Sequence, residues 1–172
     1  ADVGGFLVLE GLDGAGTTTQ AERLVVDLRT RGEGVVRTAE PTDLPVGRLI
    51  RATLRRDVEA PGRTTLPWMF AADRADHLAR RVEPALAQGA WVVADRYVPS
   101  SLAYQSDDHP MELVETLNAT FRVPDLVLFV VVDVDTAMAR IQARIRDLET
   151  ANEELIEQWG RSVAGESEEE PA

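Results

Sequence analysis

A glycine-rich turn near the start of the chain constrains the fold more than any other feature. Residues 6–10 form a short apolar run, residues 11–18 (GLDGAGTT) form the turn, and residues 18–31 repeat apolar side chains at helical spacing. Such a turn directs several backbone N–H groups toward one point, and the following helix adds the positive end of its dipole. The pattern therefore predicts a strand, a phosphate-binding loop and a helix.

The same alternation of apolar runs and helical stretches continues along the chain. Further strands are predicted at residues 35–38, at 91–95 and within the run 125–133. Further helices are predicted at residues 46–54, 66–88, 110–120 and 136–159. Val- and Leu-rich strands separated by helices indicate a parallel sheet, because such a sheet is buried on both faces. We expect an α/β fold of the P-loop NTPase type, a doubly wound parallel sheet with helices on both faces.

Length and composition favour one soluble domain. A chain of 172 residues buries roughly 70% of its unfolded surface, and no apolar run approaches the roughly 20 residues of a membrane span. No leader-like segment opens the chain and cysteine is absent, so we expect a cytoplasmic protein without a membrane partner. We predict a single domain over residues 1–164 and a disordered acidic tail over residues 165–172.

The charge composition narrows the class of ligand. A net charge of −12 disfavours binding to nucleic acid, because a polyphosphate backbone would be repelled by most of the surface. A small anion held by local donors remains compatible with this charge. All 18 basic residues are arginines, whose forked guanidinium groups suit phosphates, although coding bias explains the absence of lysine equally well.

The loop lacks the lysine that usually completes this motif. Gly11 and Gly16 hold its ends, and Thr18 stands where a hydroxyl would ligate Mg²⁺, but Thr17 occupies the lysine position. Three interpretations are open: a turn without a ligand, a nucleotide binder with little or no catalysis, or an enzyme in which arginines supply the missing charge. The third matches the way an arginine finger stabilises a transferred phosphoryl group.

Four segments together resemble the thymidylate kinase family of nucleoside-monophosphate kinases. Residues 6–20 (FLVLEGLDGAGTTTQ) resemble the family's first strand and loop, and residues 40–42 (EPT) resemble the turn after its second strand. Residues 70–74 (FAADR) resemble its F-A-A-x-R helix, and residues 95–105 (DRYVPSSLAYQ) its D-R-Y-x-x-S-S-L-A-Y-Q segment. The resemblance, which runs from Phe6 to about Val134, implies Mg²⁺-dependent transfer of the ATP γ-phosphoryl group to dTMP by a homodimer.

The resemblance also implies roles for individual residues. The expected ATP contacts are Gly11, Leu12, Asp13, Gly14, Ala15, Gly16, Thr17, Thr18, Thr19, Arg140 and Arg144. The expected dTMP contacts are Asp13, Glu40, Arg51, Phe70, Arg74, Arg96, Ser101, Tyr104 and Gln105. The expected catalytic residues are Arg96, Asp13 and Asp95, and the expected Mg²⁺ ligands are Thr18 and Asp95.

Phe70, Arg74, Arg96 and Asp95 can each be assigned a role on physical grounds. Phe70 would stack on thymine and Arg74, on the same helical face, would donate to a base carbonyl; the alternative is a core phenylalanine and a surface arginine. Arg96 follows a buried strand at its carboxyl end, where open α/β sheets bind ligands. For Asp95 the alternative to holding Mg²⁺ is a strand-end salt bridge. The two histidines, His77 and His109, are interpreted as surface residues.

The sequence departs from the family pattern at several places besides Thr17. Ala39 stands where the family usually has arginine, and the arginine-rich lid expected at about residues 140–157 is short and poorly matched, with Arg140, Arg144 and Arg146. The family's final helix and strand, whose loop contacts adenine, have no counterpart in this sequence, which indicates either a truncated chain or an incomplete donor site. The alternatives are therefore a weak or inactive nucleotide-binding homologue and a kinase for another nucleoside monophosphate.

Overall fold

The computed structural model describes residues 4–166, apart from the side chains of Arg63 and residues 158–166. Two compact parts make up this structure. The first contains residues 4–11 and 16–131, and the second contains residues 12–15 and 132–166. Among the described residues, no helix combines the length and the apolar character that crossing a membrane requires.

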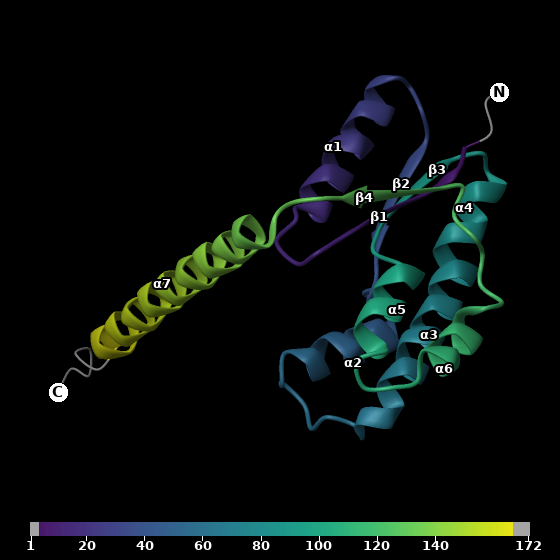
Figure 1. The fold of residues 1–172 in the computed structure, drawn as a ribbon. Coiled ribbons are helices and arrows are strands. Elements are labelled where there is room, and N and C mark those ends of the chain that lie inside the picture. Colours follow the sequence, from purple (N-terminus) through teal and green to yellow (C-terminus); the bar gives the residue numbers. More distant parts are fainter. Residues whose placement is uncertain (1–3, 167–172) are drawn as a thin grey trace. The chain divides into compact units, whose positions relative to one another are not determined.

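The elements alternate between strands and helices along the chain (Figure 1). The strands are β1 (Phe6–Gly11), β2 (Val35–Ala39), β3 (Trp91–Asp95) and β4 (Leu126–Val130). The α-helices are α1 (Thr17–Thr30), α2 (Pro45–Leu54), α3 (Leu66–His77), α4 (Glu83–Ala87), α5 (Val98–Gln105), α6 (Met111–Asn118) and α7 (Val134–Glu166). A 3₁₀ turn, η1 (Arg63–Thr65), precedes α3, and a π-helical segment, η2 (Leu78–Val82), joins α3 to α4.

The sheet is parallel throughout, in the order β2-β3-β1-β4, as predicted. In its register Leu9 of β1 and Ala39 of β2 both lie opposite Asp95 of β3. The carboxyl ends of these strands therefore meet at one edge of the sheet, where the Arg96 N–H donates to the Leu9 carbonyl at 2.9 Å. The chain winds in opposite directions from this point, which is where doubly wound sheets bind ligands.

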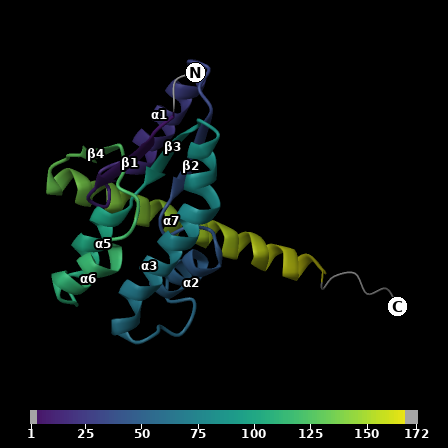
Figure 2. The ribbon, with the colours of Figure 1, turned by 90° about the vertical axis from the view of Figure 1, so that its right-hand side faces the viewer.

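The two faces of the central strands are covered by different helices, which confirms the doubly wound fold (Figure 1, Figure 2). Alternation along β1 and β3 places one set of side chains against η2 and α4: Phe6, Val8, Val92 and Ala94, with Leu78, Val82 and Ala85. The other set lies against α1: Leu7, Leu9 and Val93, with Ala21 and Val25. β4 differs from the expected buried strand, because it lies at the sheet edge and Leu126 and Phe129, on its opposite faces, remain 48% and 64% exposed.

The predicted helix over residues 66–88 is helical but not uniform. Pro84 has no N–H, and in a regular α-helix its ring would clash with the carbonyl of Arg80. The wider π-helical turn of η2 lies immediately before this proline. Helix α5 was missed from the sequence, because eight residues are too few to show an apolar period.

Helix α7 begins at Val134 and continues beyond the predicted end at residue 159 to Glu166. Asp133 starts it, because its carboxylate accepts bonds from Thr136 N at 2.8 Å and Thr136 Oγ1 at 2.7 Å. These bonds hold the pKa of Asp133 below its usual value. Residues 140–157, the expected lid, are helical throughout. The tail over residues 165–172 stays a prediction: α7 includes residues 165 and 166, and residues 167–172 lie outside the described residues.

Neighbouring valines on α1 provide a test of which helix face packs on the sheet. Val25 is 3% exposed and Val26 is 62% exposed. We expect Val25→Ala to lower the free energy of unfolding by about 2 kcal/mol, because it removes two methyl groups from a packed core. Val26→Ala should change it by less than about 0.5 kcal/mol. Denaturant titration of both variants measures the difference, and equal effects would contradict the packing of α1.

Candidate functional site

A hydroxyl and a carboxylate meet at the carboxyl edge of the sheet. Thr18, in the first turn of α1, donates from Oγ1 to Asp95 Oδ2 at 2.5 Å. Asp95 is 7% exposed, and its other oxygen, Oδ1, is buried without a hydrogen-bond partner among the described residues. An unpaired buried carboxylate oxygen beside a threonine hydroxyl fits Mg²⁺, which takes few carboxylates and keeps several waters. Both predicted metal ligands are thus brought together.

The glycine-rich loop is divided between the two parts of the structure, with Leu12–Ala15 in the second. Gly14 and Gly16 have φ of 78° and 96°, a conformation that favours glycine. A Cβ on Gly14 would meet the Ala137 carbonyl oxygen of α7 at 2.5 Å, so this contact also requires glycine. Within the same part, Arg140 NH1 donates to the carbonyls of Gly14 and Ala15, each at 3.2 Å.

The other predicted loop residues lie as follows. Thr17, in the usual lysine position, is buried at 6% exposure at the start of α1, whereas Thr19 is exposed. Leu12 and Asp13 are exposed in the second part of the structure. Arg144 is exposed one turn beyond Arg140 on α7.

Arg96 lies directly after β3 in a left-handed backbone conformation, with φ of 72°. This conformation costs a side-chain-bearing residue about 1 kcal/mol, and such strain gathers at functional sites. Its NH1 donates to the Gly11 carbonyl and to Ser100 Oγ, both at 3.0 Å. Its guanidinium carbon also lies 5.6 Å from the centre of the Tyr104 ring. A cationic group is therefore held where the ends of β1 and β3 meet the first turn of α5.

Glu10 was not singled out from the sequence, although it is a charged residue at the end of an apolar run. It is 2% exposed, and its carboxylate accepts bonds from Tyr97 N at 2.8 Å and from Ser100 Oγ at 2.7 Å. Burial raises the pKa of Glu10, and the bonds from Ser100 and Tyr97 oppose the increase. The signal in the sequence was an acidic side chain within a strand buried on both faces.

Glu40 is the centre of a second buried cluster. Arg74 donates to Glu40 Oε2 from Nε at 2.9 Å and from NH2 at 2.6 Å. The guanidinium also donates to Ser101 Oγ at 3.0 Å and to Asn118 Oδ1. His77 Nδ1 lies 2.8 Å from Glu40 Oε1. This carboxylate is therefore paired on both of its oxygens.

Two expectations are corrected by this cluster. His77 is 0% exposed, so its interpretation as a surface histidine is wrong; its Nε2 lies 2.7 Å from Thr38 Oγ1. Arg74 is 1% exposed, so the alternative of a surface arginine is also wrong. Their burial is tolerated because Glu40 and neighbouring polar side chains satisfy their hydrogen bonds inside the protein.

The turn of Glu40, Pro41 and Thr42 is held from two helices. Asp73 of α3 accepts bonds from Thr42 N at 2.8 Å and from Thr42 Oγ1 at 2.5 Å. Arg51 of α2 donates to the carbonyls of Pro41 and Thr42. The turn is therefore fixed, while most of the Arg51 side chain stays exposed.

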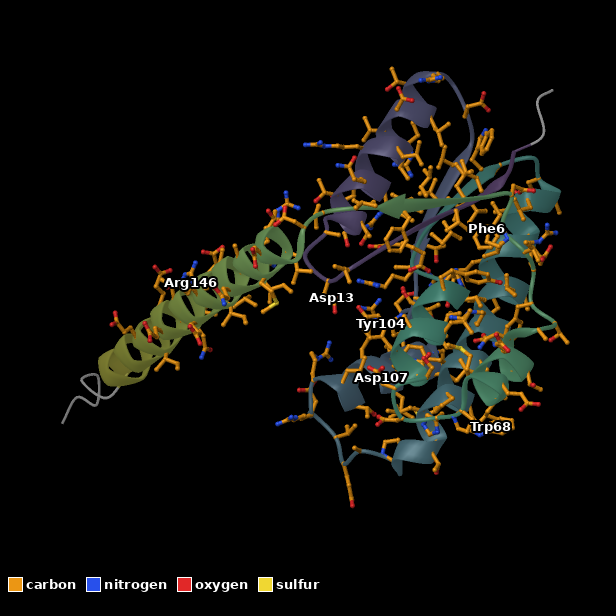
Figure 3. The ribbon with its side chains drawn as sticks, in the orientation of Figure 1. Phe6, Asp13, Trp68, Tyr104, Asp107 and Arg146 are labelled. Carbon is orange, nitrogen blue, oxygen red and sulfur yellow. The ribbon has the colours of Figure 1, made fainter. Side chains whose placement is uncertain are left out.

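Residues expected to bind the acceptor lie on α3 and α5. Phe70 is half-buried, one turn before Arg74. Ser101 and Gln105 are 3% and 8% exposed, and the buried Gln105 Oε1 has no hydrogen-bond partner among the described residues. Tyr104 is 46% exposed on α5, where Figure 3 labels it. The structure thus places the aromatic ring of Phe70 on α3, and the ring of Tyr104 and the unpaired Gln105 Oε1 on α5.

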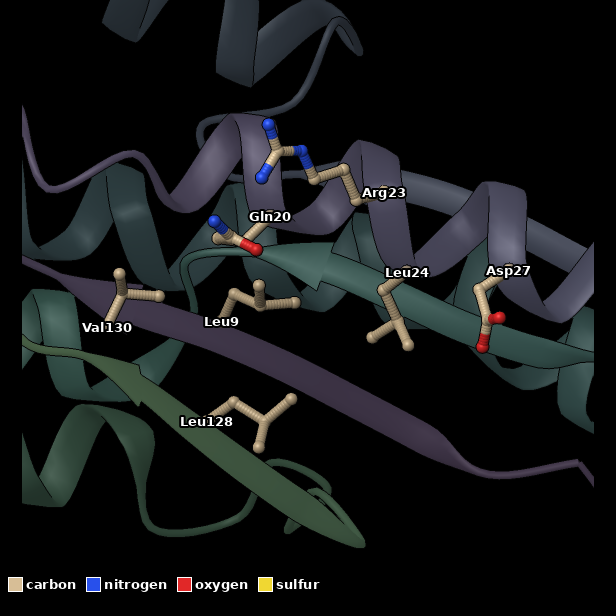
Figure 4. A pocket seen from close by; sticks show the side chains of 7 residues that line it. All are labelled: Leu9, Gln20, Arg23, Leu24, Asp27, Leu128 and Val130. Atoms are coloured by element: carbon tan, nitrogen blue, oxygen red, sulfur yellow. The ribbon is translucent and has the colours of Figure 1, made fainter.

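A groove on the other side of the sheet lies apart from these residues. It has a volume of about 510 Å³ and lies between the strands, which contribute Leu9, Leu128 and Val130, and α1, which contributes Gln20, Arg23, Leu24 and Asp27 (Figure 4). None of the predicted site residues lines it. Its lining is largely apolar, which does not suit a phosphate ester.

The buried Glu40 cluster can be tested by comparing two arginines. Arg74→Leu leaves the Glu40 carboxylate buried without its main partner, so we expect the free energy of unfolding to fall by about 3 kcal/mol. Arg80→Leu removes a pair with Asp76 in which the Arg80 side chain is 66% exposed, and should cost less than about 1 kcal/mol. Chemical denaturation of the two variants checks this, and a small effect at Arg74 would show that the cluster is not stabilising.

Comparisons with known proteins agree with this geometry. The thymidylate kinase family model matches residues 9–163. Thymidylate kinases of Synechococcus sp. (strain WH7803) and Methylobacillus flagellatus are 40% and 43% identical over 156 and 145 residues, covering 84% and 81% of this chain and 73% and 70% of theirs. The crystal structure of thymidylate kinase from Ehrlichia chaffeensis matches with a TM-score of 0.69 at 27% identity, covering 87% of this chain and 89% of that one. The resemblance and the P-loop fold are thus confirmed, and the chain belongs to the thymidylate kinase family.

Proposed function

We propose that this protein transfers the γ-phosphoryl group of ATP to dTMP, giving dTDP. The observation that carries the proposal is the strained Arg96, held by the Gly11 carbonyl and Ser100 beside the Thr18–Asp95 pair. Phosphoryl transfer requires positioning and charge stabilisation, with little covalent work by the protein. A guanidinium fork at the edge of the sheet suits both the monophosphate and the phosphoryl group in transfer.

Thr18 and Asp95 would hold Mg²⁺, which neutralises charge on the nucleotide phosphates when bound. The short bond between their oxygens orients both groups toward one place. Asp95 Oδ1 supports the assignment, because a buried oxygen without a partner is costly unless a ligand or water satisfies it. Of the two interpretations of Asp95, this observation favours metal binding over a strand-end salt bridge.

Arginines would supply the positive charge that Thr17 lacks. Arg96 would approach the phosphates from the end of β3. Arg140 lies in the other part of the structure, where it donates to the carbonyls of Gly14 and Ala15, and its ATP contact stays a prediction of the family resemblance. The loop's N–H groups and the positive end of α1 complete the donor set. Roles for Arg144 and for Asp13 in catalysis stay predictions of the family resemblance.

The acceptor would lie between α3 and α5. Phe70 would stack on thymine, and Tyr104 and Gln105 would line the sugar and base. Arg74 already donates hydrogen bonds to Glu40 and Ser101, so its main contribution would be to hold the turn at Glu40 and helix α5 in place for the acceptor. Arg51, largely exposed beside that turn, would grip the monophosphate.

Two alternatives remain open to experiment. A nucleotide-binding homologue without catalysis is favoured by Thr17 and disfavoured by the arginines near the loop. A kinase for another monophosphate would share the phosphate site and differ at the base. The homodimer and the cytoplasmic location stay predictions.

An ADP-coupled steady-state assay with dTMP, dUMP, dCMP and AMP tests the function. We expect dTMP to be preferred, and preferred turnover of AMP would overturn the acceptor assignment. Arg96→Ala should lower kcat/KM at least about 10²-fold, because it removes charge stabilisation in the transition state. Arg31→Ala, which removes an exposed pair with Asp27, is the control and should leave kcat/KM unchanged.

Restoring the missing lysine tests whether arginines suffice. We expect Thr17→Lys to change kcat by less than about tenfold, because the phosphate charge is already neutralised. A gain of about 10³-fold, equivalent to about 4 kcal/mol, would instead show that the native loop is catalytically impaired. Calorimetry with Mg²⁺ and ATP accompanies the kinetics, since absence of ATP binding by the unmodified chain would contradict the proposed function.

A further inference from the structure

A buried carboxylate links three parts of the sheet edge. Glu10 ends the apolar run of β1, 90 residues from Ser100 in sequence. Burying a carboxylate is unfavourable unless hydrogen bonds satisfy it, and an apolar residue would suit a strand covered on both faces better. A residue that breaks the local pattern in this way indicates a functional requirement.

The first contact of Glu10 supports the strained backbone of Arg96. In the left-handed conformation of Arg96, the next N–H, that of Tyr97, is directed at Glu10 Oε1 at 2.8 Å. Tyr97 is itself 0% exposed, so without Glu10 this N–H would be buried and unpaired. The carboxylate therefore offsets part of the energy that the left-handed turn requires.

The second contact reaches the guanidinium of Arg96 through one hydroxyl. Ser100 Oγ donates to Glu10 Oε2 at 2.7 Å and accepts from Arg96 NH1 at 3.0 Å. Because the carboxylate takes the hydroxyl hydrogen, the oxygen of Ser100 is oriented to accept from the arginine. The same carboxylate thus supports both the backbone of Arg96, through the Tyr97 N–H, and its side chain, through Ser100.

The third contact involves the start of α5. The helix has no side-chain cap of its own, and Glu10 Oε1 lies 3.4 Å from Ser100 N in its first turn. An anion at a helix N-terminus is stabilising. Since α5 carries Ser101, Tyr104 and Gln105, the same carboxylate also locates the helix that faces the acceptor.

We infer that Glu10 is a positioning residue for phosphoryl transfer, acting through Ser100 and the Tyr97 N–H to hold Arg96 on the phosphates. The inference rests on the proposed function of Arg96. Glu10 does not touch the substrate, and its effect on the reaction passes through the arginine.

A mutant cycle on the full chain tests this role. Glu10→Gln keeps one oxygen to accept from Tyr97 N, but the NH₂ group that replaces the other oxygen can only donate and so cannot accept the Ser100 hydroxyl hydrogen. We expect kcat to fall about 10²-fold, as for a misplacement of about 1 Å, with a smaller change in KM for dTMP. Ser100→Ala should give a loss of the same kind. The control is Glu115→Gln, which removes an exposed carboxylate on α6 and should not change kcat.

Measuring Glu10→Gln both in the wild type and in an Arg96 variant separates a positioning role from a general structural effect. The ammonium group of Arg96→Lys cannot reproduce the forked hydrogen bonds of a guanidinium. When Glu10→Gln is added to Arg96→Lys, kcat should therefore fall by less than about threefold further. An equal loss in both backgrounds would overturn the inference, as would wild-type kcat in Glu10→Gln.

If the unmodified chain does not turn over dTMP, only the proposed function is refuted. A crystal structure of Glu10→Gln still tests whether Glu10 positions Arg96. We expect the guanidinium of Arg96 to have left the Gly11 carbonyl while the packing of β1 and β3 persists. An unchanged Arg96 in that variant would refute the positioning role, whatever the activity of the wild type.

Discussion

The parallel register of β1, β2 and β3 is the constraint on which the site depends. Leu9, Ala39 and Asp95 lie at one level across the three strands, so the residues that follow them emerge together. Gly11 at the end of β1, the acceptor turn after β2 and Arg96 after β3 emerge at one edge for this reason, although long stretches of chain separate them. The two apolar faces of the central strands maintain the register, because a slip of one residue would exchange the face packed on α1 for the face packed on η2 and α4.

Two buried carboxylates organise the polar side of this edge. Glu10 acts on the loop after β3 and the start of α5, and Glu40 gathers Arg74 and His77 from α3. Removing one partner of such a cluster is destabilising, but replacing all of its members by packed apolar side chains is often neutral, so stability alone does not require a buried carboxylate. What the carboxylates provide is a fixed geometry: Glu40 orients the guanidinium of Arg74, and Glu10 orients the Tyr97 N–H and the Ser100 hydroxyl beside Arg96. A phosphate site needs this, because its chemistry depends on where charges are held.

The absence of lysine from the loop is consistent with the rest of the chain. Every basic residue is arginine, and the structure places Arg96 and Arg140 against carbonyls of the loop segment in their respective parts, Gly11 for the first and Gly14 and Ala15 for the second. A guanidinium can donate to a carbonyl and to a phosphate at once, which an ammonium does with less directional control. The composition and the geometry thus support the same account of how charge is supplied.

The sequence by itself determined the strand-loop-helix start, the parallel α/β fold, the family, and the positions of Thr18, Asp95 and Arg96, because each follows from a local motif or from an apolar period. Only the tertiary structure decided the burial of Glu10, Arg74 and His77, the helix α5, and the exposure of β4. Glu10 and Glu40 find their partners 90 and 34 residues away, and no local spacing encodes such a pairing. A polar side chain looks alike in sequence whether it faces water or a buried partner, and the free energy that separates these states arises only when distant segments pack together.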